Sequence, residues 1–216
     1  MVLQWAKNFW DELDFIHAEY GYRTFMIYDD EVNVLVDRTL ELCRALQGRD
    51  YRFRGFIKAE LFTPEVARAM AQAGFAEVCT GVESGSDRIL KLIKKNTTVE
   101  INSRARRIAR EHGIRFKAFT MVGHLGETRE DVLLTQQWLI ENRPDEFDVT
   151  LFTPYPGSPL YDRQEAFASH LQFDKAELDY TTEMAFYKGT PGEYKSYVAT
   201  PALTREELVH LRDEVE

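Results

Sequence analysis

Residues Thr80–Lys95 read TGVESGSDRILKLIKK, an apolar strand that ends in polar and small residues before a helical run. The ending contains Glu83, two serine hydroxyls and Gly85. A strand needs none of these groups to pack, whereas a small polar ligand above a sheet needs hydrogen-bond acceptors and close approach of the backbone. We therefore predict a ligand site at the carboxyl end of this strand.

Two similar strand endings follow, at residues 123–128 (GHLGET) and 153–158 (TPYPGS). Apolar runs with strand character alternate along the chain with runs of helical periodicity. This alternation predicts a parallel sheet covered by helices, with a ligand face formed by the loops at the carboxyl ends of the strands. A repeat of roughly 30 residues fits a curved, barrel-like sheet and a flat one equally well. The strands are expected at residues 25–28, 53–59, 76–82, 114–122 and 146–152.

Capping residues mark the expected helix boundaries. Thr63 followed by Pro64 predicts one helix start, and Ser86 predicts another. Thr97 with Glu100 has the pattern of a capping box. After residue 159 the pattern degrades, and residues 171–203, with Tyr187 among them, favour a hairpin or an irregular flap. Further helices are expected over residues 3–19, 34–46 and 128–141, and from the capping box at 204–207 onward.

The composition fits one domain with a tail. With 216 residues, 44% of them hydrophobic, the chain can bury one sizeable core. Its formal net charge of −9 argues against general binding of nucleic acid, which relies on clustered Lys and Arg. The arginines that do cluster in sequence are expected on the solvated face of a helix: Arg104, Arg106, Arg107, Arg110 and Arg115.

The two cysteines indicate a reducing compartment. Cys43 and Cys79 show no pairing pattern and no CxxC spacing, and no secretory signal segment is found. Both are expected to be buried as small hydrophobic residues. No apolar run approaches the ~20 residues that a membrane span needs. We therefore predict a soluble, cytoplasmic protein that does not bind membranes.

Four segments, in this order and at this spacing, resemble the radical S-adenosylmethionine (radical SAM) superfamily. They are Asp29-Asp30 after a strand, GVESGSDRILKLIKK at 81–95, MVGHLGET at 121–128 and LFTPYPGSPLY at 151–161. The likeness is closest to the branch that often carries an N-terminal cobalamin-binding domain, and looser to tRNA methylthiotransferases. It covers about residues 1–165.

The resemblance implies an α/β fold, a partial (β/α)6 TIM-like barrel of six parallel strands. It also implies a 4Fe-4S cluster held by a Cys-x3-Cys-x2-Cys loop after the first strand. Such enzymes cleave S-adenosylmethionine reductively to a 5′-deoxyadenosyl radical.

The chain departs from this family pattern at the cluster loop. It has no three-cysteine loop, only five of the six strands are visible, and the first expected element is the helix that should follow the first strand. We therefore expect a fragment from which the first strand, the cluster loop and any cobalamin domain are missing, and which is inactive alone. Residues 1–165 are expected to form the partial barrel, strands two to six, and residues 166–216 a C-terminal extension with a flap and a helix.

The resemblance also implies contacts with S-adenosylmethionine at the strand ends. Asp29 or Asp30 is expected to bind the amino group of its methionine part, since a carboxylate offers an ammonium a charge-assisted hydrogen bond. The alternative is that the pair caps the next helix. Glu83 is expected to accept from the ribose diol, and Ser84 to meet the carboxylate at a helix N-terminus. The alternative there is a plain helix cap, with Glu83 bonded to a neighbouring strand.

The remaining candidates lie at three other strand ends. Gly123 is expected to allow close approach of adenine, and Phe152 or Tyr155 to pack against it. Lys58 stands where similar sequences often have an Arg-x-Asp pair, and an ion pair at the strand end is favoured over a contact with the cofactor. His124 can be a proton carrier that faces the substrate, but we expect an exposed loop histidine without a function.

Three functions remain open. The first is the SAM-binding part of a radical SAM enzyme that abstracts hydrogen from a small organic substrate and takes an electron from a donor such as flavodoxin or ferredoxin. Methyl transfer, methylthio transfer and rearrangement are all possible outcomes. The second is a binding or scaffold module that keeps the barrel without the cluster. The third is an ordinary barrel enzyme acting on a sugar or phosphate ester, for which the histidines supply no convincing acid–base pair.

Overall fold

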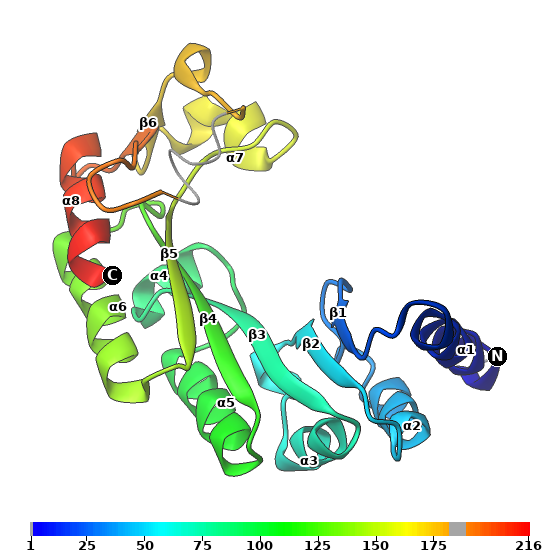
Figure 1. Cartoon of the computed structure of the whole chain (residues 1–216). Coiled ribbons are helices and arrows are strands. Elements are labelled where there is room, and N and C mark those ends of the chain that lie inside the picture. The colour runs from blue at the N-terminus through cyan, green and yellow to red at the C-terminus, as the bar shows by residue number, and fades with distance from the viewer. Residues whose placement is uncertain (1, 182–188) are drawn as a thin grey trace. The chain divides into compact units, whose positions relative to one another are not determined.

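The computed structural model describes residues 2–181 and 189–216 (Figure 1). Tyr187 of the predicted flap lies outside these ranges. The helices are α1 (Val2–Tyr20), α2 (Val36–Leu46), α3 (Pro64–Gln72), α4 (Asp87–Leu92), α5 (Val99–Glu111), α6 (Arg129–Asn142), α7 (Pro159–Asp162) and α8 (Arg205–Val215). The strands are β1 (Thr24–Ile27), β2 (Arg52–Phe56), β3 (Phe75–Glu83), β4 (Arg115–Val122), β5 (Glu146–Leu151), β6 (Gln172–Phe173) and β7 (Val198–Ala199). Short 3₁₀ turns cover Ala59–Leu61, Gln164–Phe167 and Lys175–Glu177.

The main sheet has five strands in the order β1-β2-β3-β4-β5, which confirms the predicted α/β class with a parallel sheet. Phe25 pairs with Phe53 and Phe53 with Phe75, so aromatic residues stand side by side across the first three strands. Each strand neighbours the next one in the sequence. A doubly wound sheet reverses its order at a switch point, whereas strands in sequential order are the arrangement found in barrels. The order therefore favours the barrel-like sheet over the flat one.

The chain forms two compact units. The first comprises Met1–Thr80, Glu100–Lys117 and Pro144–Glu146, and the second Gly81–Val99, Ala118–Arg143 and Phe147–Glu216. In the first unit Phe53, Phe62 and Met70 are fully buried, and in the second Leu90 and Leu208 are. Burial of such side chains is the main source of stability within each unit.

The predicted helix caps at Thr63 and Ser86 are confirmed, since the side chain of each accepts from a backbone N–H two or three residues into its helix. The Thr204–Glu207 capping box is confirmed as well. The helix predicted after Thr97 is present as α5, which begins at Val99, and the cap at Thr97 stays a prediction. The Val99 N–H donates to Asp87 Oδ1 at 2.8 Å, a contact across twelve residues that local capping patterns do not reveal.

Strand β2 ends at Phe56, three residues before the expected end. Asn33 explains the difference. Its side-chain amide donates to the Lys58 carbonyl at 2.9 Å and accepts from the Lys58 N–H at 2.7 Å. Because both backbone groups of Lys58 are taken by one side chain, the chain leaves the sheet there and turns into the 3₁₀ helix at Ala59–Leu61.

The predicted solvated arginine face is wrong at Arg106, which is buried, whereas Arg115 is exposed as expected but belongs to a strand and not to the helix. Arg106 is only 6% exposed and lies 3.5 Å from Asp145. Arg115 is the first residue of β4 and pairs with Glu77 and Glu146. Helical spacing alone could not show that these carboxylates face the two guanidinium groups.

The residues after position 165 pack within the second unit. Strands β6 and β7 pair antiparallel, as a hairpin or flap requires. Thr200 donates its hydroxyl to the Glu127 carbonyl at 2.8 Å, and Gly126 donates its N–H to the His170 carbonyl at 2.9 Å. In α8, the buried Arg212 donates to the Val149 carbonyl at 2.8 Å. The extension is therefore hydrogen-bonded to β5 and to the loop between β4 and α6. Across the described ranges, no helix combines the length and the apolar character that crossing a bilayer requires.

Candidate functional site

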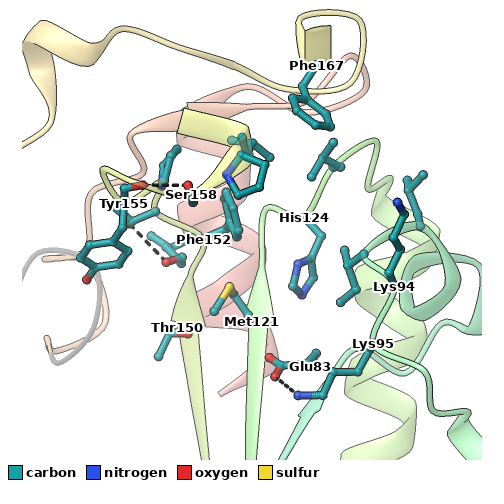
Figure 2. Close-up of a pocket in the computed structure, with 18 of the residues that line it drawn as sticks. Glu83, Lys94, Lys95, Met121, His124, Thr150, Phe152, Tyr155, Ser158 and Phe167 are labelled. Atoms are coloured by element: carbon teal, nitrogen blue, oxygen red, sulfur yellow. Dashed lines mark hydrogen bonds and ion pairs between the residues drawn. The ribbon is translucent and has the colours of Figure 1, made fainter. Parts of the chain in front are cut away.

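The second unit contains a cavity of about 770 Å³ at the carboxyl ends of β3, β4 and β5 (Figure 2). Its lining is mostly apolar. Glu83, His124 and the lysines at 94 and 95 supply the ionisable groups near the strand ends, and Arg163 lies farther along the chain. Three predicted site residues meet here: Glu83, Phe152 and Tyr155. Parallel strands bring their carboxyl ends to one edge, which is why segments far apart in sequence line one space.

Glu83 is held in an unusual conformation at the last position of β3. Its φ is +63°, a left-handed value that a residue with a side chain adopts at a cost. Its Oε1 accepts from Lys95 Nζ at 2.7 Å, so the carboxylate pairs with the loop after α4 and not with a neighbouring strand. Gly81 makes room for this pair, because a Cβ at that position would lie 2.8 Å from Lys95 Nζ and closer still to Glu83 Oε1.

The three residues after Glu83 bind α6. Ser84 is fully buried, with Oγ 3.3 Å from Thr135 Oγ1, and the Gly85 N–H donates to the same Thr135 oxygen at 2.9 Å. Ser86 donates its hydroxyl to Asp131 Oδ1 at 2.7 Å. Ser84 does not line the cavity. A contact between Ser84 and a cofactor therefore stays a prediction. The hydrogen bonds that are present join residues 84–86 to α6, and we call this segment the seat on α6.

Asp131 is the polar centre of this seat. It accepts from the Arg88 guanidinium, from Ser86, and from both the N–H and the hydroxyl of Thr128. These hydrogen bonds outweigh the burial of the group and lower its pKa to about 2. The predicted helix start at Thr128 is thus confirmed, with an aspartate as the reciprocal partner.

The loop after β4 closes around a buried glutamate. Glu127 is 0% exposed, and its Oε2 accepts from the N–H groups of Gly123 at 2.6 Å and His124 at 3.1 Å. Burial raises the pKa of Glu127 to about 8, although the two N–H groups oppose the shift. Gly123 has a φ of +100°, which suits glycine. Gly123 does not itself line the cavity, and its contact with adenine stays a prediction.

His124 is 3% exposed, so the expectation of an exposed loop histidine is wrong. The Glu127 side chain accepts from the His124 N–H and so holds the backbone there, and the ring lies in the cavity wall with its centroid 6.0 Å from that of Phe152. Burial lowers the pKa of His124. The signal in the sequence was Glu127 three residues later, a spacing that lets one carboxylate accept from two N–H groups of a turn.

Two aromatic residues at the end of β5 differ in exposure. Phe152 faces the His124 ring, whereas Tyr155 is half exposed and stacks on Tyr180 with ring centroids 5.2 Å apart. Tyr180 also donates its hydroxyl to the Pro154 carbonyl at 2.6 Å. Both predicted aromatic residues therefore line the cavity, one inside and one at its rim.

The predicted residues Asp29, Asp30 and Lys58 belong to the first unit. Asp29 and Asp30 line a cavity of about 300 Å³ there, together with Phe9 and Arg38. The alternative that the pair caps the next helix is wrong, because the N-cap of α2 is Leu35. Binding of a cofactor amino group by either aspartate stays a prediction, as does any contact of the Lys58 side chain.

The cysteines do not form a metal site. No group of three His, Cys, Asp or Glu side chains within residues 2–181 and 189–216 could hold a metal ion. Cys43 and Cys79 are both buried, as expected, and burial raises the pKa of the Cys43 thiol to about 12. The residues of this chain therefore do not fit a 4Fe-4S cluster, which needs thiolate ligands.

Comparison with known proteins identifies a family match and several relatives. Residues 6–139 match the model of the Radical SAM superfamily. An uncharacterized methyltransferase of Pyrococcus horikoshii is 30% identical over 174 residues, which is 80% of this chain and 38% of that protein. The anaerobic magnesium-protoporphyrin IX monomethyl ester cyclase of Rubrivivax gelatinosus is 27% identical over 72% of this chain and 29% of its own length. The chain thus spans about a third of these relatives.

Solved structures share the fold. The radical S-adenosylmethionine methyltransferase TsrM of Kitasatospora setae, solved with cobalamin and a [4Fe-4S] cluster bound, matches with a TM-score of 0.67 and 23% identity. The match covers 78% of this chain and 36% of TsrM. The cobalamin-dependent S-adenosylmethionine radical enzyme OxsB, with aqua-cobalamin bound, matches with a TM-score of 0.58 and 21% identity over 79% of this chain and 27% of OxsB.

Proposed function

Since the chain belongs to the radical SAM superfamily, we propose that it is the S-adenosylmethionine-binding part of a radical SAM enzyme, with the strand-end cavity of its second unit as a cofactor site. The observation that carries this proposal is the meeting of Glu83, Phe152 and Tyr155 in one cavity. A carboxylate beside apolar and aromatic walls suits a molecule that joins a ribose diol to a purine ring.

The residues present fit such a ligand. Glu83 Oε1 is engaged by Lys95, and the second carboxylate oxygen can accept from a ribose hydroxyl. The Phe152 ring can pack against adenine inside the cavity, while Tyr155, which stacks on Tyr180, lies at its rim. The left-handed backbone of Glu83 and the seat on α6 fix the carboxylate in place before a ligand arrives, which reduces the entropy lost on binding. Binding of an amino group by Asp29 or Asp30, which line a separate cavity in the first unit, is kept as a proposal of its own.

The chemistry of the whole protein is a wider proposal. When bound, S-adenosylmethionine supplies the 5′-deoxyadenosyl radical on reductive cleavage, and this chain's part is to bind, orient and shield it from water. We propose a small organic substrate and methyl transfer or ring closure as the outcome, because the relatives include a methyltransferase and a cyclase. A 4Fe-4S cluster, cobalamin and an electron donor such as flavodoxin or ferredoxin are proposed for the intact protein alone, since these residues hold no thiolate loop.

Two further expectations are kept as proposals. We propose a division into a barrel part at residues 1–165 and an extension at 166–216, and a cytoplasmic location. Limited proteolysis followed by mass spectrometry tests the first, since a domain boundary is cleaved more readily than a packed segment.

The cofactor assignment predicts that Glu83→Gln weakens binding of S-adenosylmethionine about 10-fold, because a charge-assisted hydrogen bond to a ribose hydroxyl is lost. Isothermal calorimetry on the purified chain measures this. Glu141→Gln, on the exposed face of α6, is the matched control and should bind as the wild type does. Lys95→Met removes the partner and leaves the carboxylate, so it separates the lost ion pair from the lost acceptor. Absence of binding by the wild type, or equal affinity of Glu83→Gln, would contradict the assignment.

A binding module without catalysis shares the cofactor site but not the reaction. Reductive cleavage of S-adenosylmethionine by the intact protein, followed as release of 5′-deoxyadenosine, distinguishes an enzyme from such a module.

A further inference from the structure

His124 is a buried polar side chain whose hydrogen bonding is incomplete. It lines the strand-end cavity, yet its Nε2 is buried and finds no hydrogen-bond partner among the described residues. Leaving a buried nitrogen without a partner costs roughly 1–3 kcal/mol. Such a cost at a cavity wall is explained if a bound molecule supplies the missing partner.

The surroundings of the ring indicate which role Nε2 plays. Burial is the largest influence on the pKa of His124 and lowers it, whereas the charge of Glu83 and a hydrogen bond from a ring N–H to the Glu83 backbone carbonyl raise it. A neutral imidazole has one N–H, and here that proton is used by Glu83. The other nitrogen, Nε2, then carries a lone pair and can only accept.

We propose that Nε2 of His124 accepts a hydrogen bond from an N–H or O–H group of the molecule bound in this cavity, and that His124 thereby acts as a positioning and specificity residue. This inference rests on the cavity being a ligand site, as proposed above. Figure 2 shows the His124 ring among the side chains that line the cavity, directly above the Glu83–Lys95 pair in this view. His124 stands between the backbone anchor at Glu127 and the Phe152 ring, so its orientation is fixed from two sides.

The cavity defines the chemical class of the ligand group. Met121, Leu125, Leu151 and Phe152 make the wall apolar around the ring. The group that fits this part of the wall is therefore an apolar body with an N–H or O–H donor that reaches Nε2. Two sources have this chemistry: the amino group on the adenine of S-adenosylmethionine, and a donor on the organic substrate.

The first test is made on the wild-type protein. Nitrogen-15 NMR of histidine-labelled protein, with His124→Gln used to assign the signal, reports which ring nitrogen carries the proton. The expected result at pH 7 is a neutral ring with the proton on Nδ1 and none on Nε2. A protonated Nε2, in either the neutral or the charged ring, would overturn the inference without any variant having to fold.

The second test compares matched probes that differ only in the donor. S-adenosylmethionine is paired with its analogue in which hydrogen replaces the 6-amino group, and indole is paired with 1-methylindole. Calorimetry serves for the first pair and NMR shift titration for the second. The wild type should prefer the donor-bearing member of one pair about 2- to 10-fold, the range expected for one neutral hydrogen bond. The pair that is discriminated identifies the source.

Two variants complete the design. His124→Phe keeps a ring of similar size without an acceptor and should lose the preference, whereas His124→Gln keeps an acceptor and should retain part of it. No preference by the wild type in either pair, or an equal preference in His124→Phe, overturns the inference. If S-adenosylmethionine does not bind at all, the proposed cofactor site fails, while the indole pair still tests the role of His124.

Discussion

Replacing Gly85 with alanine is expected to cost the second unit about 3 kcal/mol or more, enough to leave much of the protein unfolded in mild denaturant. A Cβ at this position would lie 2.7 Å from Thr135 Cα and closer still to the carbonyl carbon and oxygen of Leu134. These are backbone atoms of α6 and cannot move aside as a side chain does. Because the added Cβ would push this segment away from α6, the hydrogen bonds of Ser84 and Ser86 to the same helix would also be strained.

Urea unfolding followed by circular dichroism measures the effect. Gly113→Ala is the matched control, because Gly113 has a φ of +68° but no atom within 4 Å of the added Cβ. Its cost is that of the left-handed backbone alone, about 1 kcal/mol. If Gly85→Ala were no more destabilising than Gly113→Ala, the close contact with α6 would not exist.

The contribution of Glu127 to the stability of the wild type is expected to fall by about 4 kcal/mol as the pH rises from 4.5 to 8, while His124, whose pKa is lowered by burial, contributes in the opposite direction below about pH 6.5. Its pKa is about 8 in the folded protein and 4.5 when exposed, so the folded state binds more protons between these values. Stability from this group is fully present below pH 4.5 and is lost as the pH rises toward 8. Each pKa unit corresponds to about 1.4 kcal/mol, and relaxation of the buried site makes the total an upper value.

Glu127→Gln should remove this dependence. The amide oxygen can accept from the Gly123 and His124 N–H groups without titrating, so the variant should match the wild type near pH 5 and exceed it above pH 8. Urea midpoints at both pH values, with Glu141→Gln as the control, measure the difference. An equal pH dependence of the wild type and Glu127→Gln would show that Glu127 is ionised in the fold. Asp131, with a pKa lowered to about 2, affects stability only below about pH 4 and in the opposite direction.

Much of the fold was predictable because its signals are local. Thr63, Ser86 and Thr204 mark helix starts through side chains that bond the next turn, and the structure confirms each. The parallel sheet followed from alternation of strand and helix patterns. The same reasoning failed at the end of β2, where the Asn33 side chain, far away in the sequence, bonds both backbone groups of Lys58.

The site was predictable only in part, because its local signals can be seen in the sequence and its long-range contacts cannot. Glu83 and Phe152 end strands, and strand ends in a parallel sheet meet, so their presence in one cavity followed from order along the chain. His124 could not be placed, because its burial depends on Glu127 and on the packing of β5 beside it. Arg106 was misjudged likewise, since Asp145 lies far from it in sequence.

At position 83, the residue that would be best for stability differs from the residue that is proposed to bind the cofactor, because the backbone of Glu83 is left-handed. Glycine would adopt this conformation with less strain, yet it would remove the carboxylate and leave Lys95 without this partner. In a directed-evolution experiment that selects only for heat resistance, glycine or asparagine should therefore become common at position 83. Selection for cofactor-dependent activity should restore glutamate, so the outcome at this single codon would record which property the selection rewarded.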